Sequence, residues 1–437
     1  MNEKQPEPSK IMLEELQTKY SLLDFLIKKE VQKISHEMEV SIKAGDIVGL
    51  LYNAFLEQYK IPEAKKNETE VEKEKREHKL KSLNALCVRL VFCLYAEDAG
   101  IFGEKHNMFH DYLAHYEARD CRRALIELFK VLDTEEEDRE DYLEEELAQF
   151  PYVNGGLFAD ESVEIPQFTE EIRELLLTKA SEEFNWKDIS PTIFGAVFES
   201  TLNPETRRHG GMHYTSVENI HKVIDPLFMD ELEGEFETIQ TYKTLNVKRK
   251  KLMDFQEKLA HLKFLDPACG SGNFLTETYL SLRRLENKVL RVLYGEGQGV
   301  LGVAASDIIK VSIQQFYGIE INDFAVTVAK TALWIAESQM LDETKNIIYG
   351  LDGDFLPLKT YVNITEGNAL RIDWNDVISA DELNYIMGNP PFVGNSRLGD
   401  SQRAERSKLF DDRSGELDYV CCWYKMASEY ITNTDIR

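Results

Sequence analysis

The 437-residue sequence has no long apolar run, no paired cysteines and too few basic residues to neutralise its acids. No stretch reaches the ~20 uncharged apolar residues of a transmembrane helix, since the best run, residues 86–95, is short and contains Arg89. The first ten residues are polar and lack the apolar core of a signal peptide. The six cysteines form no CxxC pair and no disulfide-scaffold spacing. Together these absences predict a reducing, cytoplasmic location without membrane attachment.

Basic residues are scarce: 51 Lys and Arg stand against 78 Asp and Glu, a formal net charge of −27. This balance argues against a protein that binds nucleic acid over its whole surface, but it does not exclude a local basic cleft. Three histidines, His106, His110 and His115, are close in sequence, but no Glu follows His106 as in an HExxH zinc motif. We therefore expect histidines on a helix surface and no metal site.

Two sequence textures divide the chain. Residues 11–60 and the apolar run that ends at Gly100 repeat apolar side chains at helical spacing. After Pro191, short apolar runs that end in glycine, proline or an acid alternate with helical stretches; these runs are residues 261–266, 315–321, 361–368 and 384–389. Strand, helix and strand in that rhythm predict parallel βαβ units. We expect an α/β protein with an α-helical domain, residues 1–190, and a parallel-sheet domain, residues 191–437.

The most informative stretch is residues 264–275, FLDPACGSGNFL, where a predicted strand ends in Asp266 and turns through Gly270 and Gly272 into a helix. Glycines in such a turn adopt conformations closed to other residues and let a ligand approach the backbone. The helix would direct its free N–H groups at that ligand. The turn lacks the third glycine of the dinucleotide fingerprint and the lysine of a phosphate loop. It therefore favours a zwitterionic amino-acid tail, whose ammonium can reach Asp266, over a triphosphate.

Polar residues also follow the next two predicted strands. Glu320 ends the second strand, where an acid can accept hydrogen bonds from two ribose hydroxyls. It lies 50 residues after Gly270, against ~20 in a minimal unit. A predicted helix, residues 274–290, and an insert, residues 293–306, account for the excess. After the third strand, the small polar side chain of Asn368 is a candidate reader of an adenine edge.

Residues 384–388 form the fourth predicted strand, and Asn389, Pro390, Pro391 and Phe392 follow at once. Two prolines cannot continue a ladder, so the strand stops and the chain stiffens. Such a turn can hold one amide side chain and one carbonyl in the same direction, with an aromatic ring beside them. An isolated NPPF would indicate only a rigid strand end, but its place after Asp266 and Glu320 predicts a functional turn.

In this order, DPACGSG, YGIE and NPPF resemble the class I S-adenosylmethionine-dependent amino-methyltransferases that modify the N6 of adenine in DNA. Upstream, GGMHYTS at residues 210–216 resembles the segment that closes over the cofactor's methionine end. The blocks LCVRLVFCLYAEDAGIF, YVNGGLF and IFGAVFESTLN resemble the helical domain of the large Type IIL-like and phage-defence methyltransferases. The resemblance covers nearly the whole chain. It implies a Rossmann-like domain over residues 191–437, S-adenosylmethionine as cofactor and double-stranded DNA as substrate.

The resemblance also implies a role for each matching residue. The methionine moiety would be held by Asp266, Ala268, Gly270, Ser271, Gly272 and Asn273, and covered by Tyr214 and Thr215. Glu320 would bind the ribose, Ile321 the adenine face, and Asn368 with Ala369 the adenine edge. Asn368 stands where an aspartate is commoner, so a charge-assisted hydrogen bond to the adenine amine would become a neutral one. The catalytic turn would consist of Asn389, Pro390, Pro391 and Phe392, the last stacking on the flipped base.

The implied chemistry explains the residue types of the catalytic turn. An exocyclic aromatic amine is a poor nucleophile because its lone pair is delocalised into the ring. Hydrogen bonds from both N–H groups, to Asn389 Oδ1 and the Pro390 carbonyl, would favour a pyramidal nitrogen aimed at the methyl sulfonium. Catalysis would then consist of positioning and oriented dipoles. The target base would have to leave the base stack to reach the turn.

Two other functions stay open at this point. NPP-aromatic turns also serve the methylation of protein glutamine or RNA bases, and a non-catalytic cofactor-binding subunit would share the glycine turn. The long helical domain and the His-Tyr-Thr-Ser segment favour DNA, and an intact NPPF argues against a non-catalytic subunit. Five basic residues lie in a predicted loop, residues 393–413. This loop is equally typical of a phosphate contact and of a solvated connection.

The resemblance further implies that the methyltransferase domain is incomplete. The family's sheet has seven strands in the order 3-2-1-4-5-7-6, and this sequence supplies strands one to four and then a helix, residues 415–431. We therefore expect a shortened or split enzyme, with strand four as an unpaired sheet edge. Its target-recognition domain would be missing, and a companion polypeptide could supply the rest. The isolated chain should be aggregation-prone and methylate DNA weakly or not at all.

Overall fold

The computed structural model describes residues 24–62, 68–103, 105, 107–153, 156–195, 215–295, 303–348, 351–352, 363–410 and 417–437. Tyr214, which we expect over the cofactor, lies outside these residues, as does His106. Within the described part of the chain, no helix has the length and hydropathy needed to cross a membrane. The same part holds no group of three or more His, Cys, Asp or Glu side chains arranged for a metal ion.

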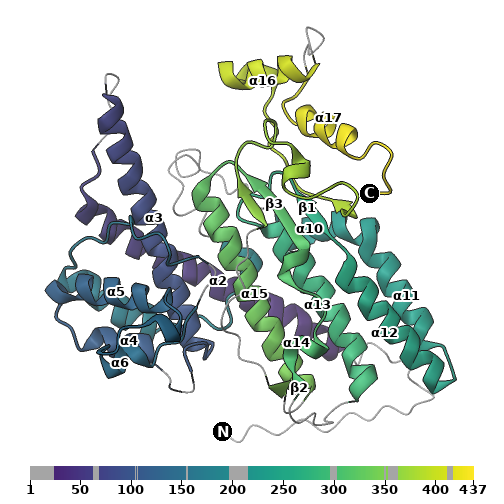
Figure 1. Cartoon of the computed structure of the whole chain (residues 1–437), viewed down its shortest axis with the longest axis horizontal. Helices are drawn as coiled ribbons and strands as arrows, with labels where there is room; N and C mark the ends of the chain where they lie inside the picture. Colours follow the sequence, from purple (N-terminus) through teal and green to yellow (C-terminus); the bar gives the residue numbers. More distant parts are fainter. Residues whose placement is uncertain are drawn as a thin grey trace, which may run out of the picture.

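The N-terminal part is helical, drawn in purple and blue in Figure 1. Its elements are α2 (Asp24–Tyr59), α3 (Glu70–Asp98), α4 (Met108–Ala114), α5 (Ala118–Leu132), η3 (Glu136–Asp138), α6 (Glu145–Ala148), α7 (Glu170–Glu174) and η4 (Leu175–Glu182). Helix α3 begins at a capping box formed by Thr69 and Glu72. Its first turns are solvent-exposed and residues 86–97 are buried. The predicted helix that ends near Gly100 is therefore confirmed, with an exposed, highly charged first half.

The C-terminal part alternates helices and strands. It runs through α10 (Val217–Ile224), η5 (Asp225–Met229), α11 (Asp230–Gln240), α12 (Leu245–His261), β1 (Phe264–Asp266), α13 (Asn273–Tyr294), β2 (Val303–Ala304), α14 (Ala305–Ile308), η6 (Ile313–Gln315), β3 (Phe316–Glu320), α15 (Asp323–Ile347), β4 (Leu351–Asp352), β5 (Ile364–Glu366), η7 (Trp374–Asp376), β6 (Tyr385–Ile386), η8 (Asn395–Arg397), α16 (Asp400–Phe410) and α17 (Cys421–Tyr430). All four strands predicted from the apolar runs are present.

Four of these strands form one parallel sheet in the order β5-β3-β1-β6. In chain order this is 3-2-1-4, as the resemblance implies. Strands β2 and β4 pair separately. Because parallel strands end at the same edge, the loops after β1, β3, β5 and β6 meet there. The acids and amides that follow the predicted strands therefore lie at that edge; they are Asp266, Glu320, Asn368 and Asn389.

The two faces of the sheet bury different side chains. On one face, Phe264 stacks between Phe316 and Tyr385 at centroid distances of 5.2 and 5.4 Å, in a core that continues into α13, α15 and the N-terminal helices. On the other face, Leu265 packs with Trp374 and other residues near α17. Alternate strand residues point to opposite faces, so both faces are covered. The N-terminal helices share the first core, and the division near residue 190 stays a prediction.

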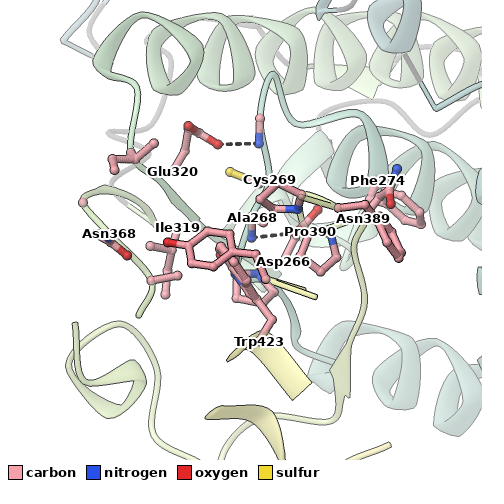
Figure 2. Close-up of a pocket in the computed structure, with 18 of the residues that line it drawn as sticks. Asp266, Ala268, Cys269, Phe274, Ile319, Glu320, Asn368, Asn389, Pro390 and Trp423 are labelled. Atoms are coloured by element: carbon pink, nitrogen blue, oxygen red, sulfur yellow. Dashed lines mark hydrogen bonds between the residues drawn. The ribbon is translucent and has the colours of Figure 1, made fainter. Parts of the chain in front are cut away.

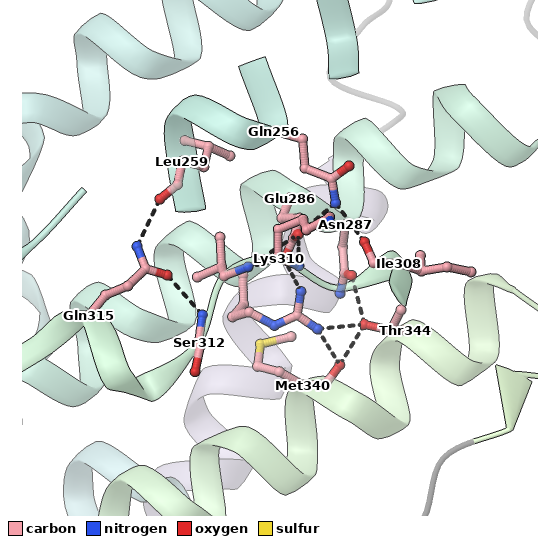
Figure 3. Close-up of polar contacts among 12 residues, drawn as sticks. Gln256, Leu259, Glu286, Asn287, Ile308, Lys310, Ser312, Gln315, Met340 and Thr344 are labelled. Atoms are coloured by element: carbon pink, nitrogen blue, oxygen red, sulfur yellow. Dashed lines mark hydrogen bonds and ion pairs between the residues drawn. The ribbon is translucent and has the colours of Figure 1, made fainter. Parts of the chain in front are cut away.

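A buried polar network anchors the long connection between β1 and β3 (Figure 3). Arg283 and Glu286 form an ion pair on α13 with both side chains almost fully buried. Glu286 Oε1 also accepts hydrogen bonds from Gln256 Nε2 (2.7 Å) and the Lys310 backbone N–H (2.6 Å). Arg283 Nη2 donates to Thr344 Oγ1 at 2.8 Å. The network ties α12, α13, α15 and the segment after α14 together, which fixes where β3 begins.

Two expectations about the last part of the chain are wrong. The loop predicted for residues 393–413 is largely replaced by α16, which covers residues 400–410 of the described part. Arg406 is buried and donates to the Leu417 carbonyl at 2.6 Å, so it does not face solvent. The outer edge of β6 is also not unpaired: Ile386 donates to the carbonyl of Arg437 and Arg437 donates to the carbonyl of Asn384. The turns after α17 bring the backbone back alongside β6.

Candidate active site

A cavity of about 940 Å³ opens at the carboxyl edge of the sheet. Figure 2 shows Asn389 and Pro390 on one side of it, Glu320 and Asn368 on the other, and Asp266 between them. The predicted residues that line it are Thr215, Asp266, Ala268, Gly270, Ser271, Asn273, Glu320, Ile321, Asn368, Ala369, Asn389, Pro390, Pro391 and Phe392. The fold thus brings both sequence motifs to one space.

Asp266 lies at the base of this cavity, only 1% exposed. Its Oδ1 accepts a hydrogen bond from the Ala268 N–H at 3.0 Å. Burial, with a smaller contribution from the negative charge of Glu320, raises the pKa of Asp266 to about 7. The chain just after β6 passes so close that a Cβ at Gly388 would overlap the Asp266 carboxylate. Gly388 immediately precedes Asn389, so this close approach sets the distance between the two motifs.

The glycine turn and Glu320 are joined directly. The Gly270 N–H donates to Glu320 Oε2 and the Asn322 N–H to Oε1, each at 2.9 Å. Gly272 has a φ of +81° and is the one predicted residue of the turn that does not line the cavity. A Cβ there would lie 2.8 Å from the Cβ of Ala329, so Gly272 lets α13 approach α15 at the start of the helix.

Asn389 contacts the segment that precedes α10. Its Nδ2 donates to Thr215 Oγ1 at 3.1 Å. No described residue donates to Asn389 Oδ1, which leaves this oxygen as an acceptor. Phe392 is 70% exposed at the mouth of the cavity, a position open to a planar partner. Both Asn389 and Phe392 therefore line the cavity, and the common direction of the amide and the Pro390 carbonyl stays a prediction.

Residues 191–195, which follow the N-terminal helices, pack against the glycine turn. A Cβ at Gly195 would lie 2.7 Å from the Ser271 carbonyl oxygen. Three residues earlier, Thr192 donates to Glu277 Oε2 at 2.9 Å, and Glu277 Oε1 lies 3.2 Å from His221 Nε2. Hydrogen bonding to Glu277 is the largest of the effects that raise the pKa of His221 to about 9. The glycine turn thus packs against the segment that follows the N-terminal helices, and the first turns of α13 contact both that segment and α10.

Several lining residues carry no recognisable sequence signal. Cys269 and Phe274 belong to the glycine-turn stretch and could be inferred from it. Other lining residues come from later segments; they are Arg371, Ser401, Gln402, Glu405, Tyr419 and Trp423. Trp423 on α17 donates to the Pro267 carbonyl at 3.0 Å. No motif marks these positions, because only the packing of α16 and α17 over the sheet edge brings them to the cavity.

The hydrogen-bond acceptors that line the cavity suit S-adenosylmethionine. Asn273 Oδ1 is buried and has no hydrogen-bond partner among the described residues, and it lies beside the glycine turn. The buried acid Asp266 at the base of the cavity fits a ligand with an ammonium group. Glu320, which accepts from two backbone N–H groups, is a carboxylate at the cavity wall, a group that accepts hydrogen bonds from hydroxyls. The cavity therefore offers acceptors of the kind that the ammonium and the ribose hydroxyls of such a cofactor need.

A parallel 3-2-1-4 sheet, a glycine turn after its first strand, an acid after its second and NPPF after its fourth define a Rossmann-like methyltransferase domain. Comparison with protein families agrees. Residues 242–437 match the family described as "MmeI, DNA-methyltransferase domain", and residues 81–158 match "MmeI, helicase spacer domain". Residues 242–437 therefore belong to the MmeI DNA-methyltransferase domain family, and residues 81–158 belong to the MmeI helicase-spacer family.

Individual relatives show how much of such a protein the chain represents. DNA methyltransferase A of Bacillus subtilis (strain 168) is 36% identical over 423 residues, 94% of this chain and 44% of the relative. A putative type II restriction enzyme and methyltransferase of Methanocaldococcus jannaschii is 26% identical over 76% of this chain and 30% of its own length. The solved structure of the Type IIL restriction-modification enzyme MmeI in complex with DNA superposes with a TM-score of 0.76 at 39% identity, covering 90% of this chain and 49% of MmeI. The chain thus spans about half the length of these relatives, or less.

Proposed function

We propose that this chain carries the cofactor-binding and amine-activating part of a site-specific DNA adenine methyltransferase. The enzyme transfers the methyl group of S-adenosylmethionine to the N6 amino group of adenine in double-stranded DNA, in restriction-modification or phage defence. The observation that carries the proposal is the close approach of Gly388 to Asp266, which brings Asn389 and this acid to one cavity. We assign the protein to the cytoplasm.

In this proposal the chain's residues bind and orient. Asp266 accepts from the ammonium of the methionine moiety, and Glu320 accepts from the ribose hydroxyls. When bound, S-adenosylmethionine supplies an electrophilic methyl group. Asn389 Oδ1 and the Pro390 carbonyl accept hydrogen bonds from the two N–H groups of a flipped adenine. These bonds favour a pyramidal N6, whose lone pair can then attack the methyl carbon. The exposed ring of Phe392 stacks on that base.

One comparison supports DNA as the substrate. The MmeI structure that this chain resembles was solved in complex with DNA. The net charge of −27 disfavours broad nucleic-acid contact by this chain alone. Sequence recognition therefore belongs to further parts of the enzyme, on the same polypeptide or on a companion polypeptide.

The test is a methylation assay with a full-length enzyme that contains this region. Purified DNA, RNA and a glutamine-containing protein are incubated separately with labelled cofactor. Label in DNA that an N6-methyladenine antibody detects supports the proposal. Label confined to RNA or protein would replace the substrate, and cofactor binding without any transfer would favour a non-catalytic subunit.

A further inference from the structure

Four donors from two neighbouring segments converge on Glu405 of α16. Its Oε1 accepts from Asn368 Nδ2 at 2.9 Å and from Arg371 Nε at 2.8 Å, and the second Arg371 nitrogen also contacts it. Its Oε2 accepts from the Tyr419 hydroxyl. All four residues line the cavity, and the Glu405 side chain is only 11% exposed. A carboxylate therefore lies beside Asn368, the residue that the family resemblance assigns to the adenine edge of the cofactor.

Counting donors and acceptors shows what this corner can still bind. Asn368 Oδ1 accepts the Leu370 N–H at 2.9 Å, and one of the two Nδ2 hydrogens goes to Glu405. The second amide hydrogen has no acceptor among the described residues. Glu405 Oε2 receives one hydrogen bond from them, and a carboxylate oxygen can accept two. The corner thus offers one free donor next to one free, charged acceptor.

This pair matches one edge of an aminopurine. Adenine carries an amino donor at C6 beside an acceptor at N1. Hypoxanthine reverses both, with an acceptor oxygen at C6 and a donor at N1. A carboxylate accepts the amine in a charge-assisted hydrogen bond, and it repels a carbonyl oxygen. The corner should therefore distinguish the two purines by the group at C6.

We propose that Glu405 reads the amino group of the cofactor's purine and supplies the negative charge that Asn368 lacks. Asn368 donates to N1 and Glu405 Oε2 accepts from the amine. The inference rests on the proposed function, because it takes the cofactor to be an adenosine derivative. It assigns to α16, a segment without a recognisable motif, a direct part in cofactor selection.

A structural role for Glu405 is the competing explanation, because its ion pair with Arg371 also fastens α16 to the loop after β5. The two roles are separable by substitution. Arg371→Met removes the fastening and keeps the carboxylate, whereas Glu405→Gln keeps the shape and removes the charge. Glu429→Gln, on the exposed face of α17, makes the same chemical change away from the cavity and serves as control.

The experiment is calorimetry of the 437-residue chain with S-adenosylhomocysteine and S-inosylhomocysteine, two stable probes that differ at the purine edge. We expect the wild type to bind the inosyl probe roughly 10- to 100-fold more weakly, the range for a buried hydrogen bond to a charged group. Glu405→Gln should lower this ratio at least tenfold, because its amide can turn to donate to the C6 oxygen. Arg371→Met and Glu429→Gln should keep the wild-type ratio.

The outcomes separate the inference from the function on which it rests. Equal affinity of the wild type for both probes overturns the inference and needs no variant to be folded. The inference is also overturned if Glu405→Gln keeps the wild-type ratio of the two affinities, or if Glu405→Gln and Arg371→Met lower that ratio equally. Glu405 would then only fasten α16 to the loop after β5. A wild-type chain that binds neither probe defeats the proposed function itself, and the inference with it.

Discussion

Cofactor binding should depend on pH through Asp266. Its pKa of about 7 means that the free site holds a neutral acid at pH 5.5 and a carboxylate at pH 7.5. In the proposed function the ammonium of S-adenosylmethionine pairs with the carboxylate, so binding at low pH would have to expel a proton. For a free-site pKa of 7, affinity should fall roughly 25-fold between pH 7.5 and 5.5, or about 1.9 kcal/mol. Over this window the ligand's α-amine stays mostly protonated, since such amines titrate at about 7.7–8.0.

The raised pKa of Asp266 also makes the folding stability of the free chain depend on pH. The pKa of Asp266 is raised from 3.8 to about 7 in the folded state, so the unfolded chain releases this proton first. Its contribution to stability is therefore complete below pH 3.8 and is lost as pH rises through 7. The raised pKa of His221, about 9, keeps that side chain protonated throughout the binding experiment.

The assay is calorimetric titration with S-adenosylmethionine at four pH values from 5.5 to 7.5. Asp266→Asn is the matched control: it should bind more weakly at pH 7.5 and show no dependence on pH. Equal wild-type affinity at pH 5.5 and 7.5 would refute the reasoning. So would an Asp266→Asn variant with the wild-type slope, because another group would then carry the titration.

Three further substitutions test other parts of the structure. In a full-length enzyme, Asn389→Ala should abolish methyl transfer and leave cofactor affinity unchanged; near wild-type turnover would remove Asn389 from catalysis. Gly195→Ala should weaken cofactor binding about tenfold or more, because its Cβ would press on the glycine turn. Gly234→Ala, whose Cβ meets nothing within 4 Å, should not, and equal effects would contradict the packing argument. Glu286→Ala should cost about 3–5 kcal/mol in urea unfolding, since it leaves a buried arginine unpaired; a loss below 1 kcal/mol would mean that the arginine finds another partner.

Much of the fold was predictable because its signals are local. A strand that ends in an acid, a turn with two glycines and a proline pair after a strand are short-range features, decided by backbone sterics and hydrogen bonding. Parallel strands then align their ends at one edge, so Asp266, Glu320 and Asn389 had to approach one another. The sheet order and the shared cavity follow from these local features together with the family resemblance.

The prediction of a loop at residues 393–413 was wrong because the structure of this segment does not depend on local signals. A helix as short and polar as α16 has weak local preference, and it is held by tertiary contacts such as the buried Arg406 hydrogen bond. The sequence shows arginines and acids there in nearly equal supply. Nothing in it says which of them turn inward.

The sequence by itself determined the four strands, the turns between strand and ligand, and the residue types at each turn. Only the tertiary structure decided that Gly388 touches Asp266, that Gly195 presses on the glycine turn and that Glu405 stands beside Asn368. These contacts join residues 37 to 122 positions apart, counting along the printed chain. Their energies depend on the packing of whole elements, and no local pattern of side chains encodes that packing.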